Sequence, residues 1–471
     1  MTDLNNILKS QQEFFKTNKN STANERIQKL LRLRDNILKY RVELSQGLAA
    51  DFKKNASEAD LTEIYPVLSE INHISSHLSK WMKDKKVKTP ILLQGTESHT
   101  RFEPLGNNLI ISPWNYPVLL SFTPLACAIG AGNTVILKPS EFTLATNKII
   151  KKVISETFTT DEVAIVEGDA SVSQQLLKLP FHHIFFTGST SVGKLVMKAG
   201  SENLAKVTLE LGGKSPVIVD SNVDIKEAAK KIAWGKCVNA GQTCIAPDYV
   251  FVKEELISDF VAAYENVIHK FYGNNDHKIQ MSKDFCRIIN DRHFDRLNGL
   301  LEQSIEAGCK KAIGGVTNSE ERFIPPTLLT GVQWDSPIMQ DEIFGPILPV
   351  MTYHDLNDVI NLVNSRPRPL ALYIFSQDQE VVDKLLNEII SGGVCVNDTI
   401  LQIANHNLPF GGINHSGLGS YHGEYGFRCF SHERAVLKRK MNIGQSFFFP
   451  PYNLATRKVV DSMIKKLNRF L

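Results

Sequence analysis

The sequence lacks the cysteine patterns of a disulfide scaffold or a zinc site. It has 7 cysteines in 471 residues, an odd number without paired spacing, and neither a C-x-x-C motif nor a Cys/His cluster. His182 and His183 begin an apolar stretch without further ligand partners, so we expect no bound metal. The N-terminus also lacks a basic start followed by an apolar core. We therefore expect a cytoplasmic chain with reduced thiols.

Long hydrophobic runs and an excess of one charge are missing too. The longest apolar run, residues 116–132, contains two prolines and is too short for a convincing membrane span. A formal net charge of +3 argues against nucleic acid or a membrane surface as the main partner. Repeats and low-complexity linkers are absent as well. A chain of 471 residues is longer than the chains that fold around a single hydrophobic core, so we predict two or three domains.

The periodicity that is present predicts an α/β protein with a helical start. Apolar residues recur at three and four spacing over the N-terminal part. From about Pro104, short apolar strands alternate with helix-length segments, which is typical of a parallel, doubly wound sheet. The strand candidates are NLIISP, NTVILKPSE, VAIVEG, HHIFFTGS and KVTLELGG, and after Ser215 SPVIVD, DYVFV, LALYIF and GGVCVN.

We predict two doubly wound domains and a small additional element. The assignments are a helical N-terminus and dinucleotide-binding domain in 1–82 and 104–210, a catalytic domain in 211–400, and a bridging or oligomerisation element in 83–103 and 401–471.

Two strand ends carry residues suited to a nucleotide cofactor. In FTGSTSVGK, Gly188 and Gly193 flank a turn that opens a helix, and helix N-termini favour anions such as a cofactor phosphate. The spacing is not the usual G-x-G-x-x-G fingerprint, so a plain strand-to-helix turn remains an equal alternative. In LKPSE, Lys138 and Glu141 lie at the carboxyl edge of the sheet, where they could hold ribose hydroxyls or form an ordinary solvated loop.

A third group of residues suggests nucleophilic catalysis. Cys244 lies in the polar, glycine-marked stretch NAGQTCIAPDY, where a buried structural cysteine is unusual. Glu210 ends an apolar strand in TLELGGKSP and is a candidate general base of raised pKa. Asn115, in the proline-bracketed ISPWNYP, offers an amide donor for an oxyanion. Taken singly, a paired glutamate and a turn asparagine are the commoner explanations.

Taken together and in order, these motifs resemble the NAD(P)-dependent aldehyde dehydrogenases over nearly the whole chain. The set is PWNYP, FTGSTSVG, ELGGKS, GQTC and EIFGP. The segments GQTCIAPDY, PFGGINHSGLGSYHG, FSHERAVLKR and FFFPPYN resemble the class 3 and fatty aldehyde dehydrogenase branch. The resemblance implies an aldehyde dehydrogenase-like fold with a Rossmann-type cofactor domain, a catalytic domain and an oligomerisation element, assembled as a homodimer. Asn414 stands where the family often has glycine, and asparagine tolerates positive φ.

The resemblance also implies a role for each matching residue. Cys244 is the nucleophile, Glu210 the base, and Asn115 with the Cys244 backbone amide the oxyanion hole. Lys138 and Glu141 hold the adenosine ribose, Ser189 and the Gly188 turn the pyrophosphate, and Glu342 the nicotinamide ribose, with Phe344 nearby. The full set implied to bind the cofactor is Trp114, Lys138, Glu141, Gly188, Ser189, Gly193, Leu211, Glu342 and Phe344. Trp114 and Tyr116 fit packing and the lining of a substrate tunnel equally well.

The implied reaction oxidises an aldehyde to its carboxylic acid and reduces NAD(P). A thiolate adds to the aldehyde, the adduct expels hydride, and the thioester is hydrolysed by water that Glu210 activates. A free thiol has a pKa of about 8.5, so Cys244 requires activation by its surroundings. Coenzyme A-acylating relatives generally lack the carboxylate that matches Glu210, and a non-catalytic relative should have lost Cys244. Both alternatives are less favoured.

The sequence leaves open which aldehyde is used; we expect a medium- or long-chain aliphatic or an aromatic one. Glu141 should repel a 2′-phosphate, so we expect NAD to be preferred and NADP to be usable.

The C-terminal segment, residues 455–471, reads as a basic amphipathic helix. Val459, Met463, Ile464 and Leu467 recur at helical spacing among basic residues. Such helices can lie on anionic membranes. We favour docking of this stripe on a partner subunit or near the substrate entrance of a homodimer, with at most weak, salt-sensitive membrane attachment. The preceding residues Phe447, Phe448 and Phe449 look like anchors to the protein body.

Overall fold

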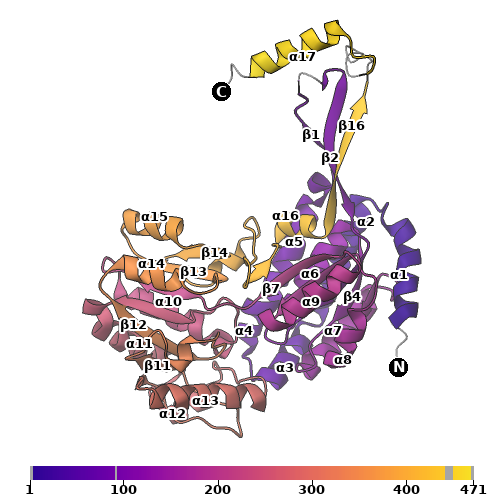
Figure 1. The fold of residues 1–471 in the computed structure, drawn as a ribbon. Helices are drawn as coiled ribbons and strands as arrows, with labels where there is room; N and C mark the ends of the chain where they lie inside the picture. Colours follow the sequence, from indigo (N-terminus) through magenta and orange to yellow (C-terminus); the bar gives the residue numbers. More distant parts are fainter. Residues whose placement is uncertain (1–3, 91–92, 441–448, 468–471) are drawn as a thin grey trace. The chain divides into compact units, whose positions relative to one another are not determined.

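The chain forms two units (Figure 1). The computed structural model describes residues 4–90, 93–440 and 449–467. The larger unit comprises Met1–Trp81 and Pro104–His432, and the smaller comprises Met82–Glu103 and Glu433–Leu471. Residues 401–432 thus belong to the larger unit.

The larger unit begins with helices, as the periodicity predicts. They are α1 (Leu4–Asn18), α2 (Ala23–Lys39), α3 (Arg41–Phe52), α4 (Ala56–Ala59), a π-helical turn (Asp60–Ile64) and α5 (Tyr65–Trp81). A capping box of Thr22 and Glu25 starts α2, because the two residues satisfy each other's free backbone N–H groups. Leu30, Leu33 and Ile37 of α2 are fully buried, which places its apolar face in the core.

A six-stranded sheet follows and contains the first series of predicted strands. Its order is β15-β7-β6-β3-β4-β5, parallel except for the antiparallel β15. The strands are β3 (Asn107–Ile111), β4 (Thr134–Lys138), β5 (Val163–Ile165), β6 (His183–Gly188), β7 (Lys206–Leu211) and β15 (Gly417–Leu418). Between them run α6 (Leu119–Ala131), α7 (Leu144–Thr157), α8 (Ala170–Leu176) and α9 (Thr190–Glu202). The parallel, doubly wound prediction is confirmed for this sheet.

A seven-stranded sheet contains the second series and adds strands that the sequence did not reveal. Its order is β10-β11-β12-β9-β8-β13-β14, with only β10 antiparallel to its neighbour. The strands are β8 (Pro216–Val219), β9 (Tyr249–Lys253), β10 (Lys310–Ile313), β11 (Thr327–Thr330), β12 (Ile347–Tyr353), β13 (Ala371–Phe375) and β14 (Gly393–Val396). Its helices are α10 (Ile225–Cys237), α11 (Ile257–Tyr272), α12 (Asp276–Met281), α13 (Asp291–Glu306), α14 (Leu356–Asn364) and α15 (Gln379–Glu388). Within β12, Pro349 pairs with Leu329, although proline argues against a strand interior.

The remaining elements are a small sheet, built from two chain segments, and the two C-terminal helices. β1 (Lys85–Val87), β2 (Thr96–Pro104) and β16 (Ser431–Arg439) form a three-stranded sheet. α16 (Gly423–Cys429) precedes β16 in the larger unit, and α17 (Leu454–Leu467) lies in the smaller one. Among the described residues, every helix falls short of the length and apolar character that crossing a membrane requires.

The apolar side of α17 is exposed in this single chain. Val459 is 41% exposed, Val460 40% and Ile464 52%, and Phe449 before the helix is 68% exposed. Phe447 and Phe448 lie outside the described residues. The helix is therefore as predicted, whereas its docking on a partner stays a prediction.

A buried ion pair joins the N-terminal helices to the β3–α6 loop. Lys54 Nζ lies 2.6 Å from Glu63 Oε1, and both side chains are fully buried. Glu63 Oε2 accepts a hydrogen bond of 2.9 Å from the backbone N–H of Val118, and the Lys54 ammonium lies 4.6 Å from the Tyr116 ring centroid. The pair thus fixes the loop that carries Asn115.

We expect Lys54→Met to destabilise the protein by about 3–5 kcal/mol, because it leaves the Glu63 charge buried alone. Arg41→Ala is the matched control, since it breaks the exposed Arg41–Asp60 pair of the same segment and such pairs contribute little. Urea denaturation midpoints measure both effects. Equal midpoints for the two variants would contradict this account of the buried pair.

Candidate active site

A cavity of about 1620 Å³ lies in the larger unit, beside the carboxyl ends of β6 and β7. Open α/β sheets bind ligands at this edge. The predicted residues that line the cavity are Cys244, Glu210, Asn115, Trp114, Gly188, Ser189, Leu211, Glu342 and Phe344. Lys138, Glu141 and Gly193 do not line it. The structure therefore brings the three catalytic candidates to the same cavity.

The turn before Cys244 has an unusual backbone. Asn239 and Ala240 have φ of 52° and 51°, and a Cβ on Gly241 would lie 2.3 Å from the carbonyl oxygen of Gly345. Gln242 is fully buried and holds the turn from both sides. Its Nε2 donates to the Asn239 carbonyl at 2.9 Å, and its Oε1 accepts from the Ile289 N–H at 3.0 Å. Cys244 follows this rigid turn with its side chain partly exposed to the cavity.

Burial and two nearby acidic residues determine the pKa of the Cys244 thiol. Burial raises the pKa of Cys244 above its ordinary value, and the charges of Glu342 and Glu210 raise it further, while the N–H groups of Cys244 and Ile245 act in the opposite direction. These effects favour the protonated thiol. Positive charge near the sulfur would have the opposite effect and favour the thiolate.

Both neighbouring carboxyl groups are themselves hard to ionise. Burial raises the pKa of Glu210 well above its usual range. Neither Glu210 oxygen has a hydrogen-bond partner among the described residues. Burial, with a contribution from Asp248, raises the pKa of Glu342 to about 8, and the Gly213 N–H opposes this. Such unsatisfied, neutral carboxyls are suited to proton transfer and to accepting ligand hydroxyls.

Asn115 is held next to the nucleophile turn. Its Nδ2 donates to the Gln242 carbonyl at 3.0 Å, and its own carbonyl accepts from Asn239 Nδ2 at 2.8 Å. The neighbouring hydroxyls of Tyr116 and Thr243 are hydrogen-bonded at 2.7 Å. Since a side-chain amide carries two hydrogens, the second one remains available for an oxyanion. Tyr116 is therefore packed and hydrogen-bonded, and it also lines the cavity.

The turn after β6 has the geometry of an anion site. Ser189 is the N-cap of α9 and accepts from the Val192 N–H. A Cβ on Gly193 would lie 2.6 Å from Leu211 Cδ2, so Gly193 lets α9 approach the end of β7 closely. Gly193 and Leu211 thus position the helix N-terminus, whose free N–H groups favour a phosphate.

Lys138 and Glu141 face one another after β4. Lys138 Nζ lies 3.6 Å from Glu141 Oε2 and donates to the Pro139 carbonyl at 2.8 Å. Lys138 is buried and Glu141 is partly exposed. The two hydroxyl groups of a ribose at this edge would meet one hydrogen-bond donor, the Lys138 ammonium, and one acceptor, the Glu141 carboxylate.

Three aromatic rings of the cavity lining lie close together, and only two of them were anticipated from the sequence. The Trp114 ring lies 5.4 Å from the Phe344 ring in an edge-to-face arrangement, and 5.0 Å from His293. His293 carries no motif that would have marked it. Gly212 leaves room for the Glu342 carboxylate, because a Cβ there would lie 1.9 Å from Glu342 Oε2. Since Glu342 Oε1 is buried without a hydrogen-bond partner in the described structure, it is suited to accept from ribose hydroxyls.

The sequence comparison decides the family. Residues 1–436 match the Aldehyde dehydrogenase family. The chain belongs to this family. It is 45% identical to the 4,4'-diaponeurosporen-aldehyde dehydrogenase of Staphylococcus aureus over 439 residues, which cover 93% of this chain and 94% of that protein. It is 43% identical to rat aldehyde dehydrogenase family 3 member B1 over 437 residues, which cover 92% and 91%.

The fold comparison agrees. A solved structure described as the substrate-bound state of Staphylococcus aureus AldH matches with a TM-score of 0.94 and 42% identity, covering 98% of this chain and 100% of that one. The predicted aldehyde dehydrogenase fold and the class 3 resemblance are thereby confirmed. This aldehyde dehydrogenase oxidises aldehydes with NAD(P).

We expect Gly212→Ala to weaken NADH binding at least about tenfold, equivalent to about 1.4 kcal/mol, because the new Cβ displaces the Glu342 carboxylate. Gly393→Ala is the control, since a Cβ at that position meets nothing within 4 Å. Fluorescence titration with NADH measures both dissociation constants. An unchanged affinity in Gly212→Ala would remove Glu342 from the cofactor site.

Proposed function

We propose that Cys244 is the nucleophile, Glu210 the general base, and Asn115 with the Cys244 N–H the oxyanion hole. The observation that supports this most is the shared cavity: it is lined by a partly exposed thiol and by a buried carboxyl group without hydrogen-bond partners among the described residues. In the first step Cys244 Sγ bonds to the aldehyde carbon, and the thiol proton leaves for solvent or base. The carbonyl oxygen becomes an oxyanion, which accepts hydrogen bonds from Asn115 Nδ2 and the Cys244 N–H.

The second half of the reaction restores the thiol. NAD(P), when bound, supplies the positive ring and the hydride acceptor that convert the Cys244 adduct into a thioester. Glu210 then takes a proton from water, the hydroxide attacks the thioester carbon, and the C–S bond breaks. Its high pKa makes Glu210 a strong enough base to take this proton once it is ionised.

We expect mutations to separate formation of the thioester from its hydrolysis. Cys244→Ala should abolish NADH formation, because no covalent adduct forms. Glu210→Gln should still give a burst of about one NADH per active chain, followed by turnover lowered by about 10²–10⁴, the usual contribution of a general base. Stopped-flow absorbance at saturating aldehyde measures the burst.

Two outcomes would contradict these roles. Full steady-state turnover by Glu210→Gln at neutral pH removes Glu210 from hydrolysis, and loss of the burst places it in acylation instead. The same assay with added coenzyme A tests the alternative acyl transfer; a stimulated steady state and a thioester product would favour that reaction over hydrolysis.

For the cofactor, we propose that Lys138 and Glu141 hold the adenosine ribose, and Ser189 with the Gly188 turn the pyrophosphate. Glu342 would hold the nicotinamide ribose, with Trp114, Gly193, Leu211 and Phe344 shaping the site. The N-terminus of α9 and the buried Glu342 oxygen support this arrangement.

NAD should be preferred over NADP, because the Glu141 carboxylate repels a 2′-phosphate. We expect kcat/KM to be higher with NAD, and Glu141→Gln to narrow the difference. A higher kcat/KM with NADP in the unchanged enzyme would refute the role of Glu141.

For the substrate, we propose a medium- or long-chain aliphatic or an aromatic aldehyde. The apolar residues of the cavity support this: Leu61, Leu119, Leu120, Leu401, Ile403 and Phe410 line it. A panel of aldehydes of increasing chain length, scored by kcat/KM, tests the proposal. A preference for two- or three-carbon aldehydes would contradict it.

For assembly, we propose a cytoplasmic homodimer in which α17 docks on protein. This proposal is supported by three exposed apolar side chains of α17, Val459, Val460 and Ile464, which a contact with protein would bury. We expect truncation after Ser446 to lower stability and to leave co-sedimentation with anionic vesicles unchanged and weak. Strong vesicle binding that truncation removes, at unchanged stability, would favour a membrane role for the helix.

A further inference from the structure

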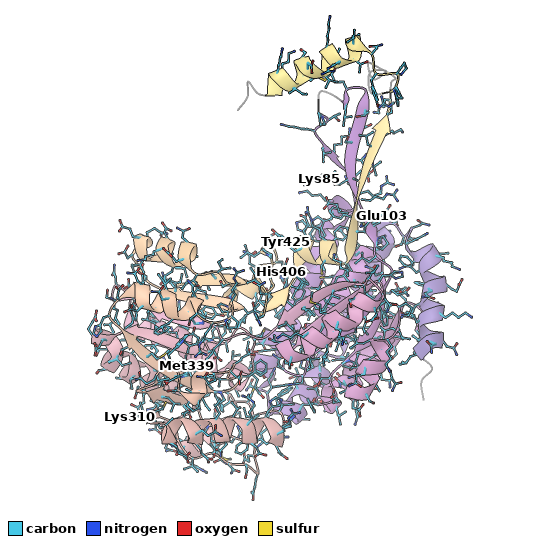
Figure 2. The ribbon with its side chains drawn as sticks, viewed as in Figure 1. Lys85, Glu103, Lys310, Met339, His406 and Tyr425 are labelled. Carbon is cyan, nitrogen blue, oxygen red and sulfur yellow. The ribbon has the colours of Figure 1, made fainter. Side chains whose placement is uncertain are left out.

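Three potential metal ligands from distant parts of the chain meet beside the active-site cavity. They are Glu70 of α5, His406, and His422, which precedes α16. One ligand atom from each lies within 4.8 Å of the others, and Glu70 and His422 are buried. His406 Nδ1 lies 2.5 Å and His422 Nδ1 3.3 Å from the same oxygen, Glu70 Oε2. Figure 2 labels His406 in the larger unit.

The cluster is only partly satisfied by its own hydrogen bonds. His422 Nδ1 is hydrogen-bonded to Glu70 Oε2, whereas the buried His406 Nδ1 lies close to the same oxygen without the geometry of a hydrogen bond. The other ring nitrogen of His406 is held by Ser69 Oγ at 2.8 Å, as the second nitrogen of a metal-bound histidine usually is. His422 has φ of 76°, a costly conformation for a non-glycine residue. The surrounding fold thus holds both rings at one carboxylate oxygen.

We propose that Glu70, His406 and His422 bind a Zn²⁺ ion. Zinc lies about 2.0–2.2 Å from histidine nitrogen and carboxylate oxygen, and tetrahedral bonds of that length place ligand atoms about 3.4 Å apart. The 3.3 Å between His422 Nδ1 and Glu70 Oε2 already matches this spacing. His406 has to move outward by about 1 Å. Two imidazoles and one carboxylate favour zinc over magnesium, which prefers oxygen ligands.

The position of this site gives the ion a role outside the reaction itself. His406 and His422 line the active-site cavity, and His406 also lines a second cavity of about 390 Å³ with His73, His77 and Trp81. Glu70 Oε1 already accepts a hydrogen bond of 2.7 Å from the Gly423 N–H. A bound ion would add a further link between α5 and the segment that contributes His406 and His422 to the cavity lining. Zinc should therefore stabilise this part of the lining and raise the melting temperature by mass action.

Competition for zinc with a chromophoric chelator tests the proposal on the full chain. The parent variant is Cys244→Ala, because a reactive cavity thiol could bind zinc itself. We expect one zinc ion per chain in the parent. In the Glu70→Gln and His406→Gln variants of this parent, affinity should fall more than about 100-fold, beyond the effect of changes outside the ligand set. Magnesium at the same concentration should not compete.

His354→Gln is the matched control, because His354 and Glu254 form an exposed histidine–carboxylate pair without a third ligand. It should bind zinc like the parent. Absence of zinc binding in the parent, or equal affinity in parent and ligand variants, would overturn the proposal. If the Glu70→Gln variant does not fold, the His406→Gln variant alone provides the mutational test, because the His406 side chain is only partly buried. X-ray absorption of the zinc-loaded parent provides a separate criterion: a shell of nitrogen and oxygen supports the site, and a sulfur shell overturns it.

Discussion

The free-energy cost of ionising three buried acidic groups determines the electrostatics of this active site. The Cys244 thiol and the Glu210 and Glu342 carboxyl groups line one cavity, and burial raises the pKa of each. Charge on any one of them makes charge on the other two less favourable. All three groups therefore favour their protonated, neutral forms. Under the proposed function, the positive ring of a bound NAD(P) would favour the Cys244 thiolate.

Hydrogen bonds and a buried ion pair hold the backbone around the thiol and around Asn115 in place. The turn with positive φ at Asn239 and Ala240, locked by the buried Gln242, fixes the thiol. Asn115 is joined to the same turn, and the buried Lys54–Glu63 pair anchors the loop that carries it. The proposed catalytic groups therefore depend on strand ends, helices and a buried network that extend well beyond the cavity.

Much of the fold was predictable because its central strands are short, apolar and bounded by turn residues. β10 escaped notice because Lys310 and Lys311 make it polar, and β12 because Pro349 lies inside it. Asn414 does adopt a positive φ of 56°, as expected where relatives have glycine. The catalytic candidates were recognisable as motifs. The cluster of Glu70, His406 and His422 was not, because Glu70 and His422 are 352 residues apart and only the tertiary fold brings them together.

The pH dependence of Cys244 alkylation, measured without cofactor, tests the electrostatic account most directly. An ordinary cysteine has a pKa of about 8.5. The account predicts a higher pKa for Cys244 in the unchanged enzyme and a lower one in Glu342→Gln. The difference should be largest above pH 8, where Glu342, whose pKa is raised to about 8, becomes charged. A Cys244 pKa at or below 8.5 in the unchanged enzyme, or one that Glu342→Gln leaves unaltered, would contradict it.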